Sequence, residues 1–443
     1  MTKNLLIKPL EEKDKKKTFK IAVPGSKSYT NRALLIASLA KGESVLTNVL
    51  HSDDTKVMID ALRELGVKIT EEGTTLRIKG CNGKFKKPKK ELYFGNAGTG
   101  VRFMASTLAI QNFECTITGN PRMLNRPIKG LVDALRQGGA EIEYLGTEGF
   151  PPLRIKGGFE GGKIQIPGNT SSQYVSSLLL ISPYTKKPTD IVVGKNLVSK
   201  PYVDMTIEIM RAFNVTKGKR LKYQRFIISN KTSYRGTTYN IDADASSASY
   251  FFALGALHGT AVTITNAKYN SAQGDIKFVD LLKKAGCEVK IDKKEGITVK
   301  GPEKKDAEGR MLKSLGNVDM NAMPDVALTM AIISVFSKGK TRLKNIPNLR
   351  VKECDRILAM TSGLNRINCK ARQMADGMEI KGHPHKCHGA EIETYDDHRV
   401  AMCFGVLGTL IPEIVILEPE CVSKTYPNFW KDLKKFGVKT EKK

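Results

Sequence analysis

Six times along the chain, a polar or glycine-rich turn leads directly into an apolar segment of small residues. The turns begin near Gly25, Gly95, Gly168, Ala243, Met320 and Tyr395, so successive starts lie about 70 to 77 residues apart. Self-similarity at a fixed period indicates one supersecondary unit used repeatedly. Ala, Ser, Leu and Ile occupy nearly every face of these segments, which predicts helices buried on all sides.

The first repeat shows the order of elements. Residues 19–23 read as a strand, and a helix is expected from about Tyr29 to Ala40. A second strand, an amphipathic helix ending at Gly66 and two more strands follow, and this order returns in later repeats. The sequence therefore predicts an α/β protein built from six βαβαββ repeats, in which strands cover buried helices.

Three repeats in each of two domains is the simplest division of the chain. We expect residues 23–241 to form one domain, and residues 1–22 to join residues 242–443 in the other. Each repeat opens a helix whose first backbone N–H groups are free, and such helix ends attract anions. We expect the active site in the cleft between the domains, where these helix ends gather.

Composition excludes a membrane-spanning or exported protein. The longest apolar runs are too short to cross a bilayer. Residues 1–17 contain acidic side chains and no sustained apolar core, so neither a signal peptide nor a transit peptide is expected. The eight cysteines are scattered without a CxxC pair, which is typical of a reducing compartment. We predict a cytoplasmic protein with no membrane partner.

The formal net charge of +27 raises the alternative of a nucleic-acid-binding protein. Much of this charge is lysine in short runs, at residues 13–17, 84–90 and the C-terminus. Aromatic residues are not interleaved with these runs, as a stacking surface for single strands requires. We predict a solvated, lysine-rich surface and no nucleic-acid partner; filter binding with a steep salt dependence would support the alternative.

The first two turns carry cations beside helix starts. Lys27, Ser28 and Arg32 project from the first, and a cation pair at this spacing can approach one anion. The competing interpretation is a helix cap with exposed cations. The second turn, GNAGTG, is neither a Walker A sequence nor a dinucleotide fingerprint. Its glycines permit close backbone approach to a ligand. The candidates there are Asn96, Gly98 and Arg102, with Arg126 downstream.

The third turn offers neutral hydrogen-bonding groups. Ser171, Ser172 and Gln173 stand at the helix start, and Ser199 and Tyr202 follow in VSKPYVD. Such groups can fix hydroxyls or phosphate oxygens by geometry. Serines at a helix start are more often capping residues than ligands, and both interpretations stay open.

The fifth repeat contains the candidate acid–base groups. Asp325 lies in an otherwise apolar helix start, MPDVALTM, as a dipole partner or as a base held in a cleft. Asn348, Lys352, Glu353 and Arg356 follow in NLRVKECDR. Two carboxylates and a lysine near bound anions can divide the general acid and base roles. Glu353 could equally be an exposed i,i+3 partner of Arg356.

The sixth repeat adds His398 and Arg399 in YDDHR, and Lys424 in CVSKTYPNFW. Cys421 precedes Lys424 by three residues, either as a thiol near the site or as a buried spectator. The segment 383–388, HPHKCH, has donor atoms for a metal, but its spacing fits no common zinc pattern. We expect no metal site.

Ten blocks of the sequence together resemble the 5-enolpyruvylshikimate-3-phosphate synthase family. They span essentially the whole chain, in the order PGSKSYTNRALL, SDDTK, GNAGTGVRF, PRMLNRPI, SSQYVSSLL, SKPYVDMT, DASSASYF, RVKECDRI, YDDHRVAM and SKTYPNFW. Details such as HSDDTK and RVKECDRI are most similar to the corresponding domain of the pentafunctional AROM polypeptide. A fusion to other shikimate-pathway domains is therefore a further expectation.

The resemblance implies a fold and a reaction. The fold is the enolpyruvyl transferase fold, a two-domain inside-out α/β barrel of six βαβαββ repeats. In the reaction, the 5-hydroxyl of shikimate 3-phosphate attacks C2 of phosphoenolpyruvate while C3 is protonated. The tetrahedral intermediate then loses phosphate to give the enolpyruvyl ether, an intermediate of aromatic amino acid biosynthesis. Neither a metal nor an organic cofactor is implied.

The resemblance also implies roles for residues. Shikimate 3-phosphate would contact Lys27, Ser28, Arg32, Ser171, Ser172, Gln173, Ser199, Tyr202, Asp325, Asn348 and Lys352. Phosphoenolpyruvate would contact Lys27, Gly98, Arg126, Gln173, Arg356, Arg399 and Lys424. Asp325 is similar to the base that handles the hydroxyl proton, and Glu353 and Lys27 are candidates for proton transfer at C3. Asn96, Arg102, His398 and Cys421 are supporting candidates.

Two alternatives remain beside the nucleic-acid reading. One is the sister transferase that acts on UDP-N-acetylglucosamine. That family usually carries a cysteine in a mobile loop, whereas the loop PRMLNRPI has none and Ser28 follows Lys27. The other is an inactive scaffold domain, which the sequence gives no reason to choose because all the expected charged residues are present.

Overall fold

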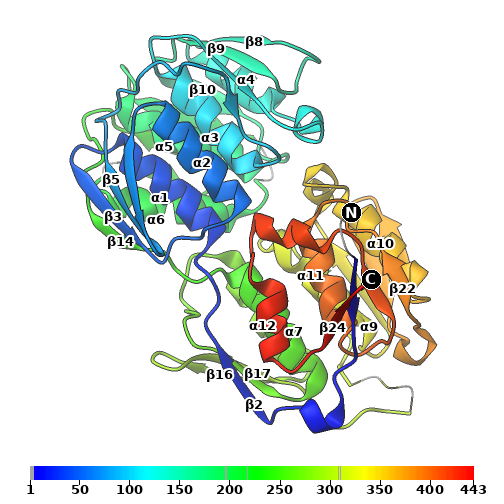
Figure 1. The fold of residues 1–443 in the computed structure, drawn as a ribbon. Helices are drawn as coiled ribbons and strands as arrows, with labels where there is room; N and C mark the ends of the chain where they lie inside the picture. The colour runs from blue at the N-terminus through cyan, green and yellow to red at the C-terminus, as the bar shows by residue number, and fades with distance from the viewer. Residues whose placement is uncertain (1–3, 195–196, 217, 308, 310) are drawn as a thin grey trace. The chain divides into compact units, whose positions relative to one another are not determined.

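The structure is a computed structural model that describes residues 4–194, 197–216, 218–307, 309 and 311–443. The chain forms two compact units. One is Gly25–Asp242, called here the 25–242 unit. The other, the 243–443 unit, combines the chain up to Pro24 with Ala243–Lys443 (Figure 1).

Each unit has apolar helices at its centre. In the 25–242 unit they are α1 (Lys27–Leu39), α3 (Gly98–Ala109) and α5 (Ser172–Ile181). In the 243–443 unit they are α7 (Ala245–His258), α9 (Ala327–Val335) and α11 (His398–Leu407). Every residue of α3, α7, α9 and α11 is buried. The prediction of helices buried on all sides is confirmed for these four. Small side chains allow this burial because they let the helices pack closely against one another.

The second helix of each repeat is amphipathic, as predicted. These helices are α2 (Asp53–Glu64), α4 (Lys129–Gln137), α6 (Lys200–Ala212), α8 (Phe278–Lys284), α10 (Arg356–Arg366) and α12 (Phe429–Lys435). In α2, for example, Met58, Ile59 and Leu62 are buried, whereas Lys56 and Asp60 form an exposed ion pair. Apolar burial on one face fixes such a helix to its unit.

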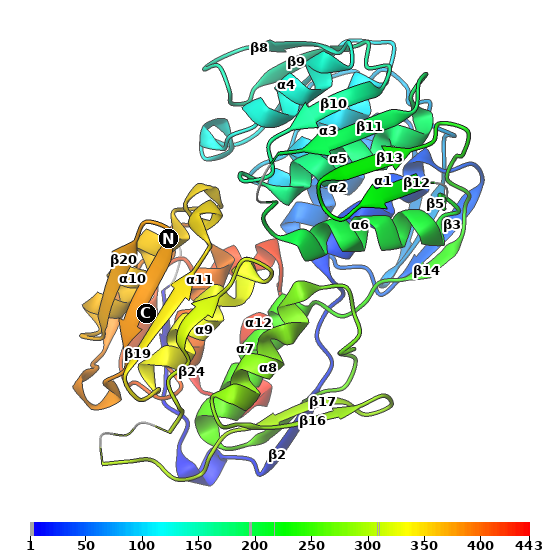
Figure 2. The same ribbon diagram turned by 180° about the vertical axis from the view of Figure 1, so that it is seen from behind.

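The described strands of the 25–242 unit form three sheets of four strands. One sheet has the order β14 (Thr238–Asn240), β3 (Glu43–Thr47), β5 (Thr75–Lys79), β4 (Lys68–Glu72). The next is β6 (Leu92–Tyr93), β7 (Cys115–Thr118), β9 (Leu153–Gly157), β8 (Glu141–Tyr144). The third is β10 (Gly162–Ile166), β11 (Thr189–Val193), β13 (Arg225–Ile228), β12 (Gly218–Leu221). Figure 2 shows this third sheet lying over α5, with which β11 is in contact.

The 243–443 unit repeats this arrangement in its described residues. One sheet has the order β2 (Thr18–Ile21), β15 (Ala261–Ile264), β17 (Gly296–Lys300), β16 (Glu288–Asp292). The next is β18 (Gly316–Asp319), β19 (Lys340–Lys344), β21 (Gly377–Lys381), β20 (Lys370–Met374). The third is β22 (Ala390–Ile392), β23 (Ile414–Ile416), β1 (Leu5–Ile7), β24 (Thr440–Lys442). In all six sheets the first pair is parallel and the other two pairs are antiparallel. The predicted sixfold use of one βαβαββ unit is confirmed. Each described sheet is open, so none closes into a barrel by itself.

One strand belongs to a different sheet from the one that reading along the chain suggests. Residues 19–23 read as the first strand of the first repeat, whereas the expected domain division placed residues 1–22 with residues 242–443. In the structure, β2 pairs in parallel with β15 of the 243–443 unit. The strand that completes the first sheet of the 25–242 unit is β14, which pairs with β3. Phe19 and Ile21 of β2 are buried and Thr18 and Lys20 are exposed. This alternation specifies a half-buried strand but not which sheet it joins.

Short 3₁₀ helices carry several residues that matter below. They are η4 (Gly274–Lys277), η5 (Pro324–Val326), η6 (Pro347–Val351) and η8 (Pro419–Lys424). The inner helices α1, α5, α7 and α11 start at side-chain caps: for example, Ser26 accepts from the Tyr29 N–H, and Asp244 accepts from the Ser247 N–H at 2.8 Å. These caps fix where each helix begins, and therefore where its first turn presents side chains.

Candidate active site

The candidate residues of the 25–242 unit lie at or near the starts of α1, α3, α5 and α6, except Arg126, which follows α3 in the chain. Helix α3 contacts both α1 and α5, and α6 contacts α1 and α5. The tight packing of these four helices lets side chains from widely separated parts of the sequence interact. Lys27, Arg32 and Arg102 are each held by a side chain on another helix, and together with Arg126 they are called here the cation cluster.

Arg32 is the best-defined member of this cluster, with an exposure of 1%. Its Nε donates to Oγ1 of Thr206 at 2.8 Å, and its terminal nitrogens donate to the carbonyl oxygens of Ser28 at 2.9 Å and Tyr202 at 3.1 Å. Its guanidinium also stacks on Phe103, 5.2 Å from the ring centroid. These acceptors are all neutral, and burial lowers the pKa of Arg32 to about 10. An anion bound here would stabilise the charged guanidinium and so offset the loss of hydration that burial causes.

Lys27 stands in the first turn of α1 and is held from α2. Its Nζ lies 3.1 Å from Oδ2 of Asp54, which is buried at the start of α2. A lysine ammonium on a flexible stem has no preferred direction of its own. The Asp54 carboxylate supplies that direction, so Lys27 is presented in a fixed position near the start of α1.

A hydrogen-bonded chain ties the starts of α3 and α5 together. Arg102 donates from Nη1 to Oε1 of Gln173 at 2.7 Å, and Nε2 of Gln173 donates to Oγ1 of Thr99 at 3.0 Å. The Arg102 guanidinium also lies over the Tyr174 ring, 5.6 Å from its centroid. Arg102 therefore positions Gln173, which the sequence analysis placed among the ligand contacts.

Arg126 lies against the GNAGTG turn. Its Nη1 donates to the backbone oxygen of Asn96 at 2.8 Å and to Oδ1 of the same residue at 2.9 Å. A Cβ added at Gly98 would lie 2.5 Å from Nη2 of Arg126 and 2.8 Å from Nη1 of Arg102. Only glycine lets the two guanidinium groups come this close to the start of α3.

The serines divide between capping and other roles. Ser171 caps α5, because its Oγ accepts from the N–H of Gln173 at 3.2 Å, and Ser172 is buried in the first turn. Ser28 contributes its carbonyl oxygen to Arg32. Ser199 precedes α6 with a φ of 53°, a left-handed conformation that a serine rarely adopts. Such strain concentrates at functional positions, and Tyr202 follows one turn later.

In the 243–443 unit, Asp325 is held between two arginines. Its Oδ1 accepts from Nη1 of Arg356 at 3.0 Å, and its Oδ2 accepts from Nη2 of Arg399 at 2.9 Å. Nζ of Lys352 lies 3.6 Å from Oδ1. Burial would raise the pKa of Asp325, but the charges of Arg399, Lys352 and Arg356 outweigh it and hold the pKa well below 3.8. Asp325 is thus ionised at neutral pH.

Arg356 joins three carboxylates at the start of α10. Besides Asp325, its Nε donates to Oδ2 of Asp397 at 2.6 Å, and its Nη2 donates to Oε2 of Glu353 at 2.8 Å. Burial alone would lower the pKa of Arg356, but Asp397, Glu353 and Asp325 raise it. Glu353 is the i,i+3 partner of Arg356, and with 7% exposure this pair is buried rather than on the surface.

Asp397 is also the cap of α11. Its Oδ1 accepts from the N–H of Arg399 at 2.9 Å, and its side chain is fully buried. The same oxygen lies 3.7 Å from Nδ1 of His398, which is fully buried too. Arg399 in turn donates from Nη1 to the hydroxyl of Tyr250 at 3.4 Å. One carboxylate therefore orients both Arg356 and the helix start that carries Arg399.

The remaining candidates lie on neighbouring short helices. Asn348 is buried in η6, and Lys424 is buried at the end of η8, which packs against α11. Lys424 is close enough to Asp396 to oppose the rise in that carboxyl pKa caused by burial. Burial, followed by the charge of Asp397, raises the pKa of Cys421. Its thiol is therefore protonated at neutral pH, which favours the spectator role over a reactive one.

Sequence reasoning missed two carboxylates that position cations, Asp54 and Asp397. Both follow another aspartate at a helix start, in SDD and YDDH. An acidic pair at a helix start was the available signal, but it is also an ordinary capping pattern. The long-range partners, Lys27 and Arg356, are what distinguish these two residues.

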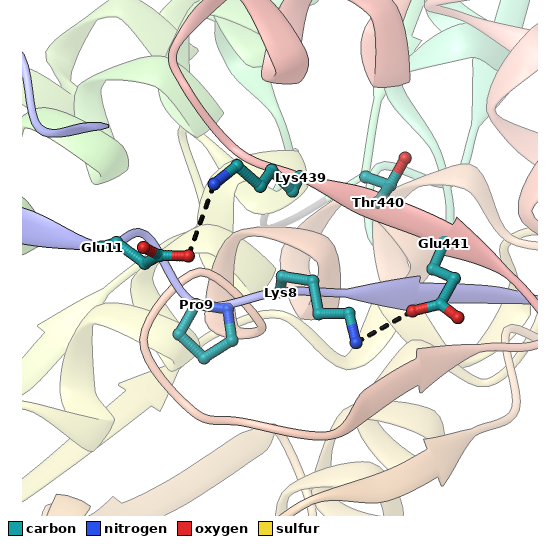
Figure 3. Close-up of a pocket in the computed structure, with 6 residues that line it drawn as sticks. All are labelled: Lys8, Pro9, Glu11, Lys439, Thr440 and Glu441. Atoms are coloured by element: carbon teal, nitrogen blue, oxygen red, sulfur yellow. Dashed lines mark hydrogen bonds and ion pairs between the residues drawn. The ribbon is translucent and has the colours of Figure 1, made fainter. Parts of the chain in front are cut away.

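Among the residues that the structure describes, no group of three His, Cys, Asp or Glu side chains is arranged to hold a metal ion. None of the described helices is long and apolar enough to cross a membrane. A pocket of about 590 Å³ lies at the chain ends, lined by Lys8, Pro9, Glu11, Lys439, Thr440 and Glu441 (Figure 3). Lys8 pairs with Glu441 at 2.9 Å and Lys439 with Glu11 at 3.4 Å, so the lining charges are compensated within the pocket.

Comparison with known proteins gives one consistent result. The family model described as EPSP synthase (3-phosphoshikimate 1-carboxyvinyltransferase) matches residues 12–433. A 3-phosphoshikimate 1-carboxyvinyltransferase of Klebsiella pneumoniae strain 342 is 42% identical over 94% of this chain and 96% of its own. The protein of the same name from Erwinia tasmaniensis is 43% identical over 93% of this chain and 95% of its own.

Solved structures agree with the sequence relatives. A structure of EPSP synthase from Acinetobacter baumannii has a TM-score of 0.80 and 27% identity, covering 99% of this chain and 100% of that one. A second EPSP synthase structure from the same organism has a TM-score of 0.79 and 25% identity, with 99% of each chain covered.

Proposed function

Because the chain belongs to the EPSP synthase family, we propose that its two buried charge clusters bind and activate the two anionic substrates of that family's reaction. Its function is the transfer of the enolpyruvyl group of phosphoenolpyruvate to the 5-hydroxyl of shikimate 3-phosphate, with release of phosphate. The observation that carries the assignment of the reacting groups is Asp325, an ionised and buried carboxylate held between Arg356 and Arg399. Joining a hydroxyl group to an anionic enol ester requires a base to take the hydroxyl proton and cations to hold the anion.

We propose that Arg32 is the principal cation for shikimate 3-phosphate in the 25–242 unit. Its buried guanidinium meets neutral acceptors, and no described carboxylate pairs with it. A phosphate dianion would offset the desolvation of this charge with charge-assisted hydrogen bonds. The further contacts proposed for this substrate are Lys27, Ser28, Ser171, Ser172, Gln173, Ser199, Tyr202, Asp325, Asn348 and Lys352.

Phosphoenolpyruvate carries both a phosphate and a carboxylate, so it needs cations on more than one side. Arg126 beside Gly98 offers one guanidinium group, and Arg356 with Arg399 offers two more. Arginine suits this task because its planar fork matches carboxylate and phosphate oxygens. We assign to this substrate Lys27, Gly98, Arg126, Gln173, Arg356, Arg399 and Lys424, with Asn96, Arg102 and His398 in support.

The reaction is proposed to proceed by addition and elimination. Asp325 takes the proton of the 5-hydroxyl as its oxygen forms a bond to C2 of phosphoenolpyruvate, while C3 gains a proton. The tetrahedral intermediate then loses that C3 proton and expels phosphate. Glu353 and Lys27 are the proposed groups for the proton at C3, since Glu353 is held against Arg356, a proposed anion contact, and Lys27 is held in position by Asp54.

The low pKa of Asp325 makes it a weak base in the substrate-free protein. Arg399, Lys352 and Arg356 cause that low pKa. When two substrate anions share these cations, their hold on Asp325 weakens and its proton affinity rises. Substrate binding would thereby activate the base only when both reactants are present.

Several earlier expectations stay predictions. They are the cytoplasmic location, the absence of a cofactor, the absence of a nucleic-acid partner, the placement of the active site between the two domains, and a fusion to other shikimate-pathway domains. The chain and its curated relatives match over nearly their full lengths.

Titration calorimetry with shikimate 3-phosphate alone tests the substrate assignment. Arg32→Gln should raise the Kd by about tenfold or more, because a charged hydrogen bond to phosphate is lost. Arg126→Gln, which changes a proposed phosphoenolpyruvate contact, should leave this Kd within about threefold of the wild type. Equal losses in both variants, or a loss only in Arg126→Gln, would contradict the assignment.

A further inference from the structure

Side chains of the segment around η4 form hydrogen bonds to residues at the start of α7. Gln273 accepts from the N–H of Ala245 at 3.2 Å and donates to the carbonyl oxygen of Ala243 at 2.8 Å. Two residues later, Oδ2 of Asp275 accepts a short hydrogen bond from Oγ of Ser246. The two side chains bracket the start of α7, so Asp275 is fixed relative to the inner helices of the 243–443 unit.

Asp275 is a buried carboxyl group with unused hydrogen-bonding capacity. Its exposure is 3%, and its Oδ1 has no hydrogen-bond partner among the residues that the structure describes. Burial, and then the charge of Asp325, raises the pKa of Asp275 to about 7. Burial and the lack of a partner for Oδ1 therefore favour the neutral acid over the carboxylate.

The charged groups around Asp275 come from the elements that η4 contacts and from α11. From η5 comes Asp325, and from the start of α7 comes Asp244. Arg399 on α11 is the cation whose charge opposes the rise in the Asp275 pKa. Lys277 of η4 and Asp280 of α8 are both engaged with Tyr269, whose hydroxyl donates to Asp280 and whose ring lies under the Lys277 ammonium.

Charge balance shows why the state of Asp275 matters. Around Arg356, the ion-paired cations are Lys352, Arg356 and Arg399, and the carboxylates are Asp325, Glu353 and Asp397. Within these described ion pairs the three cations balance the three carboxylates. A neutral acid at Asp275 preserves this balance, whereas an ionised carboxylate adds a negative charge that attracts Arg399 and repels an incoming anion.

We propose that Asp275 is a positioning residue for the Asp325–Arg399 pair, anchored on Ser246 and acting through Arg399 rather than on a substrate. As a neutral acid it leaves Arg399 with Asp325 and available to phosphoenolpyruvate. As a carboxylate it competes for Arg399. The inference rests on the proposed function, which assigns Arg399 to phosphoenolpyruvate.

The test is the pH dependence of KM for each substrate in wild-type protein, Asp275→Asn and Asp280→Asn. As pH rises from 6 to 8.5, the wild-type KM for phosphoenolpyruvate should rise several-fold more than that of Asp275→Asn, which cannot ionise. The KM for shikimate 3-phosphate should keep the same pH profile in both. Asp280→Asn, a carboxyl on the adjacent α8 that is engaged with Tyr269, should follow the wild type.

Ser246→Ala supplies a second test that keeps the carboxyl group. The hydrogen bond from Ser246 lowers the pKa of Asp275, so its loss should move the KM rise to higher pH. The inference would be overturned if the KM rise in Ser246→Ala occurred at the same pH as in the wild type or at a lower pH. It would also be overturned if Asp275→Asn lost activity equally at every pH. Absence of product from wild-type protein would instead refute the proposed function, so the two failures are distinguishable.

Discussion

Arg399 and Asp325 form a direct ion pair in which Nη2 of the arginine lies 2.9 Å from Oδ2 of the aspartate. The two residues are 74 positions apart in the chain and reach each other from the adjoining starts of α11 and α9. The pair joins Asp325, the proposed base, to Arg399, a residue proposed to bind phosphoenolpyruvate. In the proposed reaction, binding of phosphoenolpyruvate to Arg399 would therefore raise the proton affinity of Asp325.

Replacing Arg399 by lysine tests the importance of the guanidinium fork. A lysine keeps the positive charge but cannot contact Asp325 and an anion with the same geometry. We expect the KM for phosphoenolpyruvate to rise by about tenfold or more, because a charge-assisted bond is lost. Steady-state kinetics with Arg366→Lys as the control checks this, since Arg366 is exposed and donates to the backbone oxygen of Glu391. Equal kinetics in the two variants would contradict the assignment.

Gly98→Ala should also weaken the binding of phosphoenolpyruvate, because Gly98 and Arg126 are proposed contacts of this substrate. The new methyl group would lie 2.5 Å from Nη2 of Arg126, so the guanidinium group must move. We expect the KM for phosphoenolpyruvate to increase by about tenfold, with a smaller change for shikimate 3-phosphate. Gly146→Ala is the matched control, because its nearest added contact is an ordinary 3.6 Å to Pro152. An unaltered KM in Gly98→Ala would show that Arg126 does not serve this substrate.

Arg32→Lys should cost both stability and substrate affinity. Arg32 satisfies Thr206 and the carbonyl oxygens of Ser28 and Tyr202 at once, and lysine cannot reach all three. We expect a loss of about 2 kcal/mol in the free energy of unfolding, as for buried hydrogen bonds to a charged group. Urea denaturation measures it, with exposed Arg235→Lys as the control. A variant as stable as the wild type would mean that these hydrogen bonds contribute little.

His258 should make the 243–443 unit sensitive to acid. The ring is buried against Thr409, with Nε2 2.8 Å from Oγ1, and burial lowers its pKa from 6.5 to about 3. The folded state thus holds neutral histidine, while the unfolded chain binds a proton below pH 6.5. Stability from this group is present above pH 6.5 and is lost as pH falls toward 3.

For His258 this amounts to about 2 kcal/mol between pH 6.5 and pH 5. Denaturation across this range should show a shallower pH dependence in His258→Gln than in the wild type. Exposed His388→Gln should retain the wild-type slope. If His258→Gln kept the full slope, other groups would account for the acid sensitivity.

The repeat architecture was predictable because each local signal agreed with the next. Small-residue helices, amphipathic helices and paired strands recur at one period, so counting repeats also counts sheets. The expected domain division placed residues 18–21 with residues 242–443, but the local pattern did not identify β14 as the strand that completes the first sheet of the 25–242 unit. An alternating edge strand such as Thr18–Ile21 satisfies the same local rules in any sheet, and its partner is chosen by long-range packing.

The site shows the same limit. Arg356 and Asp325 were predictable as charged residues at helix starts, but their hydrogen bond depends on how α9 and α10 pack. Asp397 reads as an ordinary helix cap, and only its 2.6 Å contact with Arg356 gives it a second role. The sequence alone allows two roles for Glu353, an exposed partner of Arg356 or an acid–base group. Its burial excludes the exposed alternative and leaves its proposed proton transfer as a prediction.

The most direct measurement is phosphate release by wild-type protein and Asp325→Asn, with phosphoenolpyruvate and either shikimate 3-phosphate or UDP-N-acetylglucosamine as acceptor. We predict release with the shikimate ester only, and a kcat about 10² to 10⁴ lower in Asp325→Asn, the range lost with a general base. Asp60→Asn, on an exposed face of α2, should match the wild type. Wild-type rates in Asp325→Asn, or no release with either acceptor from folded wild-type protein, would contradict the account.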